Sequence, residues 1–309
     1  MQDTTTTSTI AAGIETMQQY YQQERYRAFV RPVEPAARTG SAWLIHGFLG
    51  TPADMHGLAD LTQALGFHTE GPLVSGMAGE IESLGSLTAD RWRAAALDEW
   101  DRFAAGQDGP RILIGYSMGG ALALHIAAKA TIRPDLLILL APFTRIGDWR
   151  GNALPIAKHV VRSLNFFGDA DLADPDTRDW FGRAMPELDL DDPRVQQAIR
   201  HDYQVPTAAL DELRKLADGV RRTMRRVSAP TVVVQGHHDT VVMPRDSYAL
   251  AAVLPNLLAY HEIRADHMLP YTGFSWWPTV RSLVDRAIRQ YALASASSDP
   301  VDASRWDAP

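Results

Sequence analysis

Apolar residues along the chain follow two alternating patterns. Short apolar runs bounded by glycine, proline or polar residues are typical of buried strands. They predict strands at 26–30, 42–45, 67–69, 112–114, 136–140, 231–234 and 258–263. Longer stretches in which apolar residues recur at helical spacing lie between them. They predict helices at 51–65, 88–103, 118–130, 210–226, 247–254 and 278–293.

Strands that alternate with helices indicate a doubly wound, mostly parallel α/β sheet with helices on both faces. The almost entirely aliphatic run 136–140 fits a parallel strand that is covered on both sides. The alternation stops in the middle of the chain, where aromatic residues lie among many aspartates and prolines. We therefore predict an N-terminal polar or helical segment at 1–25, an α/β core at 26–141 and 229–294, an inserted cap at 142–228 and a flexible tail at 295–309.

The stretch Gly115-Tyr116-Ser117-Met118-Gly119 lies between a predicted strand and a predicted helix. In this position G-x-S-x-G is the signature of a nucleophile elbow, a sharp turn that exposes a serine hydroxyl above the sheet. The motif alone also occurs in ordinary glycine-rich connections. Its interpretation therefore depends on partners elsewhere in the chain.

A serine hydroxyl becomes a useful nucleophile when a base accepts its proton and a third group orients that base. In folds with this elbow the order along the chain is serine, acid, histidine. Asp239 and His267 follow Ser117 in that order, each on a loop after a predicted strand. We expect Asp239 to accept the Nδ1 proton of His267. His237, His238, His261 and Asp266 lie near the same sheet edge and are rivals for these roles.

The tetrahedral intermediate of acyl transfer requires backbone donors for its oxyanion. The amide of Met118, directly after the serine, is one candidate. The amide of Phe48, on the loop after strand 42–45, is the second, and Gly47 and Gly50 would let that backbone approach closely.

Other chemistries are weaker interpretations of the same residues. A metal site could be assembled on paper from a set of polar residues: His46, His237, His238, Asp239 and His267. None shows the helical i, i+4 pairing of H-E-x-x-H. The loop 71–85 lacks the G-K-[ST] of a phosphate cradle. We therefore expect no metal and no cofactor.

Aromatic residues of the predicted cap are candidates for a substrate pocket. We assign this role to Trp149, Phe166 and Phe167, although such residues could equally be core. Trp276 and Trp277 are expected in the core.

Composition narrows the function classes. The 309 residues are 46% hydrophobic and 22% charged, which is ordinary for a soluble globular protein. The formal charge of −7 argues against nucleic acid as a partner. Cysteine is absent, which excludes disulfides and a thiol nucleophile and suits a reducing compartment. Residues 1–9 lack a signal-peptide pattern, and no apolar run approaches the ~20 residues of a membrane span. We expect a cytoplasmic protein of undetermined oligomeric state.

The motifs resemble those of the α/β-hydrolase superfamily, and within it small bacterial carboxylesterases and monoacylglycerol lipases. The similarity covers about residues 42–293 and rests on the motifs at 46–51, 115–120, 229–239 and 266–267. Relatives commonly carry a proline-glycine-histidine-glycine run where this chain has Gly71-Pro72-Leu73-Val74-Ser75-Gly76, and the cap here is longer than in the smallest members. Both departures concern the substrate pocket.

The resemblance implies a serine esterase with Ser117, Asp239 and His267 as its triad and with Phe48 and Met118 as oxyanion donors. Its expected substrate is a small-molecule ester or a monoacylglycerol, cleaved through an acyl-enzyme. A carbon–carbon bond hydrolase on the same fold and a catalytically inactive ligand-binding protein are the alternatives.

Overall fold

A seven-stranded sheet forms the centre of the protein, for which the computed structural model describes residues 21–146, 161–186 and 188–293. The strand order is β1-β3-β2-β4-β5-β8-β9, with β1 antiparallel to β3 and all other neighbours parallel. This arrangement confirms the predicted fold class. The strands are β1 (Phe29–Arg31), β2 (Gly40–Ile45), β3 (Phe67–Gly71), β4 (Arg111–Tyr116), β5 (Leu136–Leu140), β8 (Thr231–Gly236) and β9 (Leu257–Ile263).

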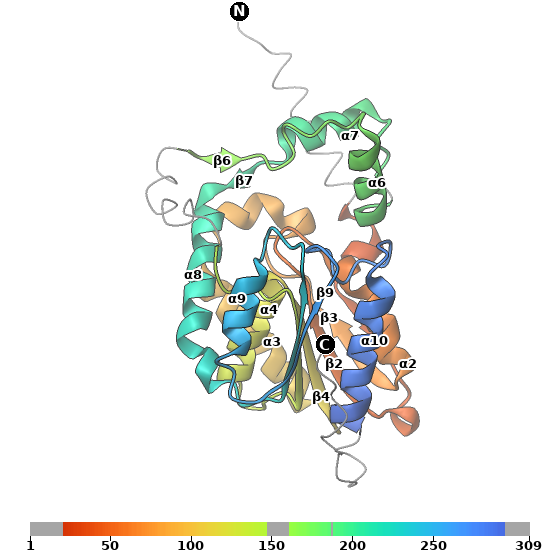
Figure 1. Cartoon of the computed structure of the whole chain (residues 1–309), viewed down its shortest axis with the longest axis vertical. Coiled ribbons are helices and arrows are strands. Elements are labelled where there is room, and N and C mark those ends of the chain that lie inside the picture. The colour runs from red at the N-terminus through yellow and green to blue at the C-terminus, as the bar shows by residue number, and fades with distance from the viewer. Residues whose placement is uncertain (1–20, 147–160, 187, 294–309) are drawn as a thin grey trace, which may run out of the picture.

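Two helical layers cover the sheet (Figure 1). On one face lie α2 (His56–Ala64), α10 (Trp277–Ala287) and η7 (Ile288–Leu293); on the other lie α3 (Ala89–Ala105), α4 (Met118–Lys129), α8 (Thr207–Thr223) and α9 (Pro244–Ala251). Alternate residues of each central strand enter opposite cores: Leu113 packs with α3 and α4, whereas Ile112 and Ile114 pack with α2 and α10. Because both faces are covered, the inner strand β5 consists entirely of buried aliphatic residues.

The first predicted strand is shifted in the structure. Tyr26 belongs to the 3-10 turn η1 (Glu24–Tyr26), and β1 begins only at Phe29. Tyr26 buries its ring edge-to-face against Tyr21, with 5.6 Å between the ring centroids. This contact takes the aromatic residue out of the sheet.

The second half of the predicted loop 71–85 forms a 3-10 helix. The remaining short turns are η2 (Pro35–Ala37), η3 (Pro52–Met55), η4 (Ala78–Ser86) and η6 (Met224–Arg226).

The segment predicted as a cap contains two kinds of structure. In Figure 1, α6 (Pro175–Ala184) and α7 (Pro193–Gln197) lie above one end of the sheet, beside the short pair β6 (Ser163–Leu164) and β7 (Val205–Pro206). They surround a small core of their own, together with η5 (Ala198–Asp202): Leu172, Phe181, Leu190, Val195 and Ile199. In contrast, α8 shares its core with α3 and α4. The cap boundaries 142–228 stay a prediction.

None of the helices within residues 21–146, 161–186 and 188–293 has the length and apolar character required to cross a bilayer.

Candidate active site

Ser117 occupies a sharp turn between β4 and α4. Its backbone adopts φ +52°, ψ −117°, a conformation that costs a non-glycine residue on the order of 1–3 kcal/mol. The glycines on either side allow the backbone of this turn to pack closely against its neighbours. A Cβ at Gly115 would overlap the carbonyl of Gly119, and a Cβ at Gly119 would overlap the carbonyl of Ile45. The spacing G-x-S-x-G thus allows α4 to begin directly against β2 and β4.

The three side chains predicted to act together form one hydrogen-bonded row. His267 Nε2 lies 3.0 Å from Ser117 Oγ, and His267 Nδ1 lies 2.8 Å from Asp239 Oδ2. A carboxylate can only accept, so Nδ1 carries the proton that it donates to Asp239. Nε2 is then the acceptor for the serine hydroxyl. This is the geometry required of a nucleophile, a general base and an orienting acid.

The carboxylate of Asp239 is buried, with 2% of the residue exposed, and four N–H groups of described residues surround it. Oδ1 accepts the backbone N–H groups of Val241 and Val242, both at 2.8 Å. Oδ2 accepts a second bond, from Gln235 Nε2 at 3.1 Å. Four donors satisfy the ionised form, which makes burial of its charge tolerable. Gln235 was not predicted from the sequence; its only signal is a polar residue at the end of an apolar strand.

The rival residues near this sheet edge have other partners. Asp266 Oδ1 accepts the N–H of Met268 at 2.7 Å, so this carboxylate caps its own loop. His237 Nδ1 pairs with Glu262 Oε1 at 2.5 Å, and its ring packs against that of His238. Burial lowers the pKa of His261. Among the residues described, no group of three or more histidine, aspartate or glutamate side chains could hold a metal ion.

The loop after β2 brings the backbone of Phe48 close to the nucleophile. A Cβ at Gly47 would lie 3.3 Å from the Cβ of Ser117, so the loop passes directly beside the serine. Leu49 has φ +59°, and its N–H faces Met77 Sδ at 3.2 Å. Met118 is the first residue of α4, where backbone N–H groups have no partner within the helix. The Phe48 loop and the first turn of α4 therefore both lie next to Ser117, and the role of their amides as oxyanion donors stays a prediction.

The side chain of His46 connects the Phe48 loop to the segment after β3 by two hydrogen bonds. Its Nε2 accepts the N–H of Val74 at 3.0 Å, and its Nδ1 donates to the carbonyl of Gly47 at 2.9 Å. Burial lowers the pKa of His46 to about 4, so the ring is neutral at pH 7 and can serve as both acceptor and donor. The sequence suggested His46 only as a possible metal ligand. Its contacts instead tie the Phe48 loop to the segment after β3.

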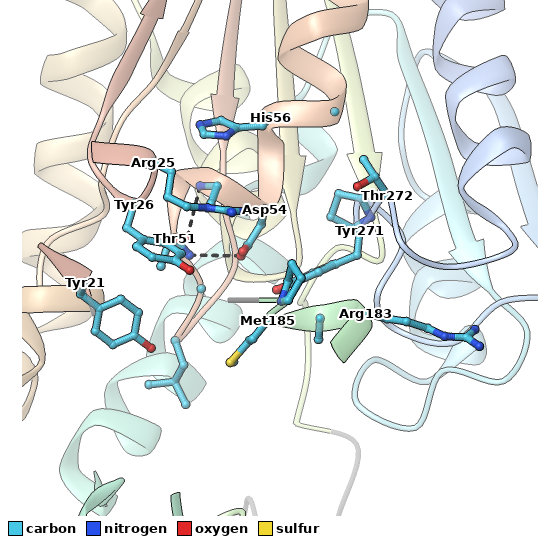
Figure 2. A pocket seen from close by; sticks show the side chains of 17 residues that line it. Tyr21, Arg25, Tyr26, Thr51, Asp54, His56, Arg183, Met185, Tyr271 and Thr272 are labelled. Carbon is cyan, nitrogen blue, oxygen red and sulfur yellow. Dashed lines mark hydrogen bonds between the residues drawn. The ribbon is translucent and has the colours of Figure 1, made fainter. Parts of the chain in front are cut away.

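A cavity of about 140 Å³ lies beside the Phe48 loop. Figure 2 shows Tyr21, Arg25 and Tyr26 on one side of it, Tyr271 and Thr272 on the other, and Asp54 between them. The lining comes from the N-terminal segment, η3, the end of α6 and the loop after His267. Segments distant in sequence therefore meet next to the proposed catalytic loops.

Among the described residues, Phe166 and Phe167, which were predicted to form a pocket, do not line this cavity. Phe166 is 55% exposed, and Phe167 packs against the rings of Trp180, Phe181 and Tyr203. Trp149 lies outside the described residues. A pocket role for these three side chains stays a prediction. Trp276 and Trp277 pack against the core on the α2 and α10 face, as expected.

Comparison with protein-family models gives a match over more than half of the chain. The model described as serine aminopeptidase, S33 (Hydrolase_4) matches residues 71–264. The chain belongs to this family. The matched stretch contains Ser117 and Asp239, whereas the Phe48 loop and His267 lie outside it.

Two curated relatives of this chain are a lipase and an esterase by name. A thermostable monoacylglycerol lipase from Bacillus sp. (strain H-257) is 26% identical over 208 residues, which are 65% of this chain and 71% of the relative. A pimeloyl-[acyl-carrier protein] methyl ester esterase from Neisseria meningitidis is 29% identical over 161 residues, but these are only 47% of this chain and 57% of the relative.

Solved structures with the same fold cover most of this chain. A structure from work on the metagenome-derived lipolytic enzymes LipS and LipT aligns with a TM-score of 0.63 and 20% identity, covering 84% of this chain and 99% of that one. The monoacylglycerol lipase of Paleococcus ferrophilus aligns with a TM-score of 0.62 and 15% identity, covering 84% and 96%. At these identities the likeness shows the fold alone, and it confirms the predicted α/β-hydrolase fold.

Proposed function

We propose that this protein is a serine hydrolase that cleaves carboxylic esters through an acyl-enzyme, with Ser117, His267 and Asp239 as its catalytic triad. The observation that carries the proposal is the row from Ser117 Oγ through His267 to Asp239, with separations of 3.0 Å and 2.8 Å. The names of the curated relatives support an ester as the substrate class. Small-molecule esters, including monoacylglycerols, are the proposed substrates.

The reaction follows from the positions of these atoms. Ser117 Oγ attacks the ester carbonyl while His267 Nε2 takes the hydroxyl proton. Asp239 stabilises the imidazolium and keeps its ring in place. Collapse of the tetrahedral intermediate expels the alcohol, which leaves with the proton from Nε2. Water, deprotonated by the same nitrogen, then attacks the acyl-enzyme, and the second collapse releases the acid and restores the serine hydroxyl.

The amides of Phe48 and Met118 are the proposed donors to the oxyanion. Both belong to backbone that flanks Ser117, and the loop of the first is held by His46. Donors fixed before the reaction need no reorganisation as charge develops, and each is typically worth about 3 kcal/mol of barrier. The mechanism derived from these residues uses no cofactor. A cytoplasmic location, suggested by the absence of cysteine, stays a prediction.

Replacement of the nucleophile tests the proposal. Ser117→Ala should lower kcat/KM for a short p-nitrophenyl ester at least 1,000-fold, because the acyl-enzyme cannot form. Ser83→Ala, which changes an exposed serine on η4, is the matched control and should retain wild-type activity. Ester hydrolysis that persists in Ser117→Ala would contradict the assignment. A wild-type protein inactive on esters would instead favour the carbon–carbon hydrolase or the inactive binding protein.

A further inference from the structure

We infer that Gln235 is a positioning residue that sets the direction of the Asp239 carboxylate toward His267. The inference rests on the proposed function, since it concerns the same triad. Gln235 lies near the end of β8 and is completely buried. Its Nε2 faces three acceptors: Asp239 Oδ2 at 3.1 Å, the Gly236 carbonyl at 3.1 Å and the Val242 carbonyl at 3.0 Å.

The hydrogen-bond network allows only one orientation of this amide. Gln235 Oε1 accepts the hydroxyl of Ser247 at 2.6 Å, and Ser247 is itself fully buried on α9. If the amide were rotated by 180°, its oxygen would face three oxygen acceptors with no proton between them. Such unpaired buried acceptors are costly. Ser247 therefore anchors the far end of the amide and directs its N–H groups toward the Asp239 turn.

The position of Gln235 gives it control over one carboxylate oxygen. Backbone N–H groups of Val241 and Val242 fix Oδ1 of Asp239. Oδ2, the atom that accepts from His267 Nδ1, has its second bond from Gln235. Gln235, on the inner strand β8, thus fixes the plane of the carboxylate. The carboxylate in turn orients the imidazole of His267 toward Ser117. Small misplacements of catalytic groups cost large factors in rate.

Gln235 acts through Asp239, because complete burial keeps it from the substrate. A purely structural role, in which the amide only braces the turn at Asp239–Val242, makes a different prediction. If Gln235 only stabilises this turn, loss of its hydrogen bonds lowers the free energy of unfolding and the fraction of folded protein. Loss of a positioning bond lowers turnover in each correctly folded molecule and leaves ground-state binding unchanged.

The experiment compares Gln235→Met, which keeps the length of the side chain but removes its hydrogen bonds, with wild type. Active sites are counted by covalent titration with a fluorophosphonate, and kcat and KM are measured with a p-nitrophenyl ester. We expect kcat per titrated site to fall about tenfold, with KM within about twofold of wild type. Gln63→Met, on α2, is the matched control, since Gln63 Nε2 donates to the carbonyl of Pro32 and has no bond to the triad. Its kcat should be unchanged.

Ser247→Ala provides a second, milder variant that retains Gln235. It should lower kcat per site about threefold, because the amide loses its anchor but keeps its donors. The double variant should be no slower than Gln235→Met alone, because Ser247 acts only through Gln235. A kcat per site within twofold of wild type in both single variants, with only the melting temperature lowered, would overturn the inference. Failure of the proposed function appears differently, as a wild-type protein that neither hydrolyses esters nor reacts with the fluorophosphonate.

Discussion

Two titratable residues lie close to the Phe48 loop, the fully buried His46 and the half-buried Asp54. Desolvation of their charged forms makes the stability of the protein depend on pH in opposite directions. Burial lowers the pKa of His46 from 6.5 to about 4, so stability is lost as pH falls through that range. Burial raises the pKa of Asp54 from 3.8 to about 7, against opposing hydrogen bonds from Thr51 and Tyr271. The folded protein then holds a proton that the unfolded chain has released. Asp54 therefore lowers stability as pH rises from about 4 to about 7.

Asp54→Asn should remove this pH dependence. An asparagine carries no charge at any pH, and its oxygen can still accept the N–H of Thr51 that Asp54 Oδ2 accepts at 3.1 Å. We expect the free energy of unfolding of the variant, relative to wild type, to rise by about 2 kcal/mol between pH 5 and pH 8. Urea unfolding of both proteins at four pH values measures this difference in the free energy of unfolding. Asp60→Asn, an exposed change on α2, is the control. A difference that does not change with pH would contradict this account of Asp54.

At the scale of elements, the elbow depends on how closely α4 approaches β2. The two elements approach closely at Gly119, since a Cβ there would overlap the backbone carbonyls of Ile45 and His46. Those carbonyls belong to the end of β2, from which the Phe48 loop departs. Any separation of the two elements would therefore also move the amide of Phe48, one of the proposed oxyanion donors, away from Ser117.

Gly119→Ala should lower both stability and activity. We expect a loss of about 2 kcal/mol in the free energy of unfolding and a fall in kcat/KM of at least tenfold. Gly182→Ala on α6 is the matched control, because no atom lies within 4 Å of its added Cβ. It should stabilise its helix by about 0.5–1 kcal/mol and leave activity unchanged. Equal effects of the two substitutions would argue against a constraint specific to the elbow.

The sequence predicted those elements whose signal is local. The alternation of apolar runs located the strands, and G-x-S-x-G with the later Asp239 and His267 located the proposed triad, because short connections at one sheet edge must bring these residues together. The bonds of Gln235 and His46 were missed, since they depend on side-chain orientation inside the fold. The cavity was missed because its walls come from four distant segments.

The whole molecule contains cores of different size. Each face of the sheet has a large core, whereas the part of the cap around α6 and α7 has a small core built on Phe181 and a few aliphatic side chains. Phe167 contacts both this small core and the core on the α3 and α4 face. A core this small should open locally at a lower free energy than the sheet.

Phe181→Ala should loosen the cap without unfolding the sheet. Loss of the aromatic ring would lower the local stability of the cap by about 3 kcal/mol, because the few side chains of this core cannot move in to fill the cavity that it leaves. In hydrogen exchange we expect faster exchange for amides of α6 and α7 and unchanged exchange for β4 and β5. Phe103→Ala, in the core between the sheet and α3, is the control and should accelerate exchange across the sheet. Faster exchange in β4 and β5 of the Phe181 variant would mean that the cap and sheet unfold together.

The central claim is that Ser117 is a nucleophile activated by His267. The most direct measurement is the site and rate of covalent modification by a fluorophosphonate, followed by mass spectrometry of the intact protein and of its peptides. We predict one adduct per chain, on Ser117, formed at least about 100-fold more slowly in His267→Gln, where the base is lost. A wild-type protein that remains unmodified, or an adduct on another residue, would contradict the claim.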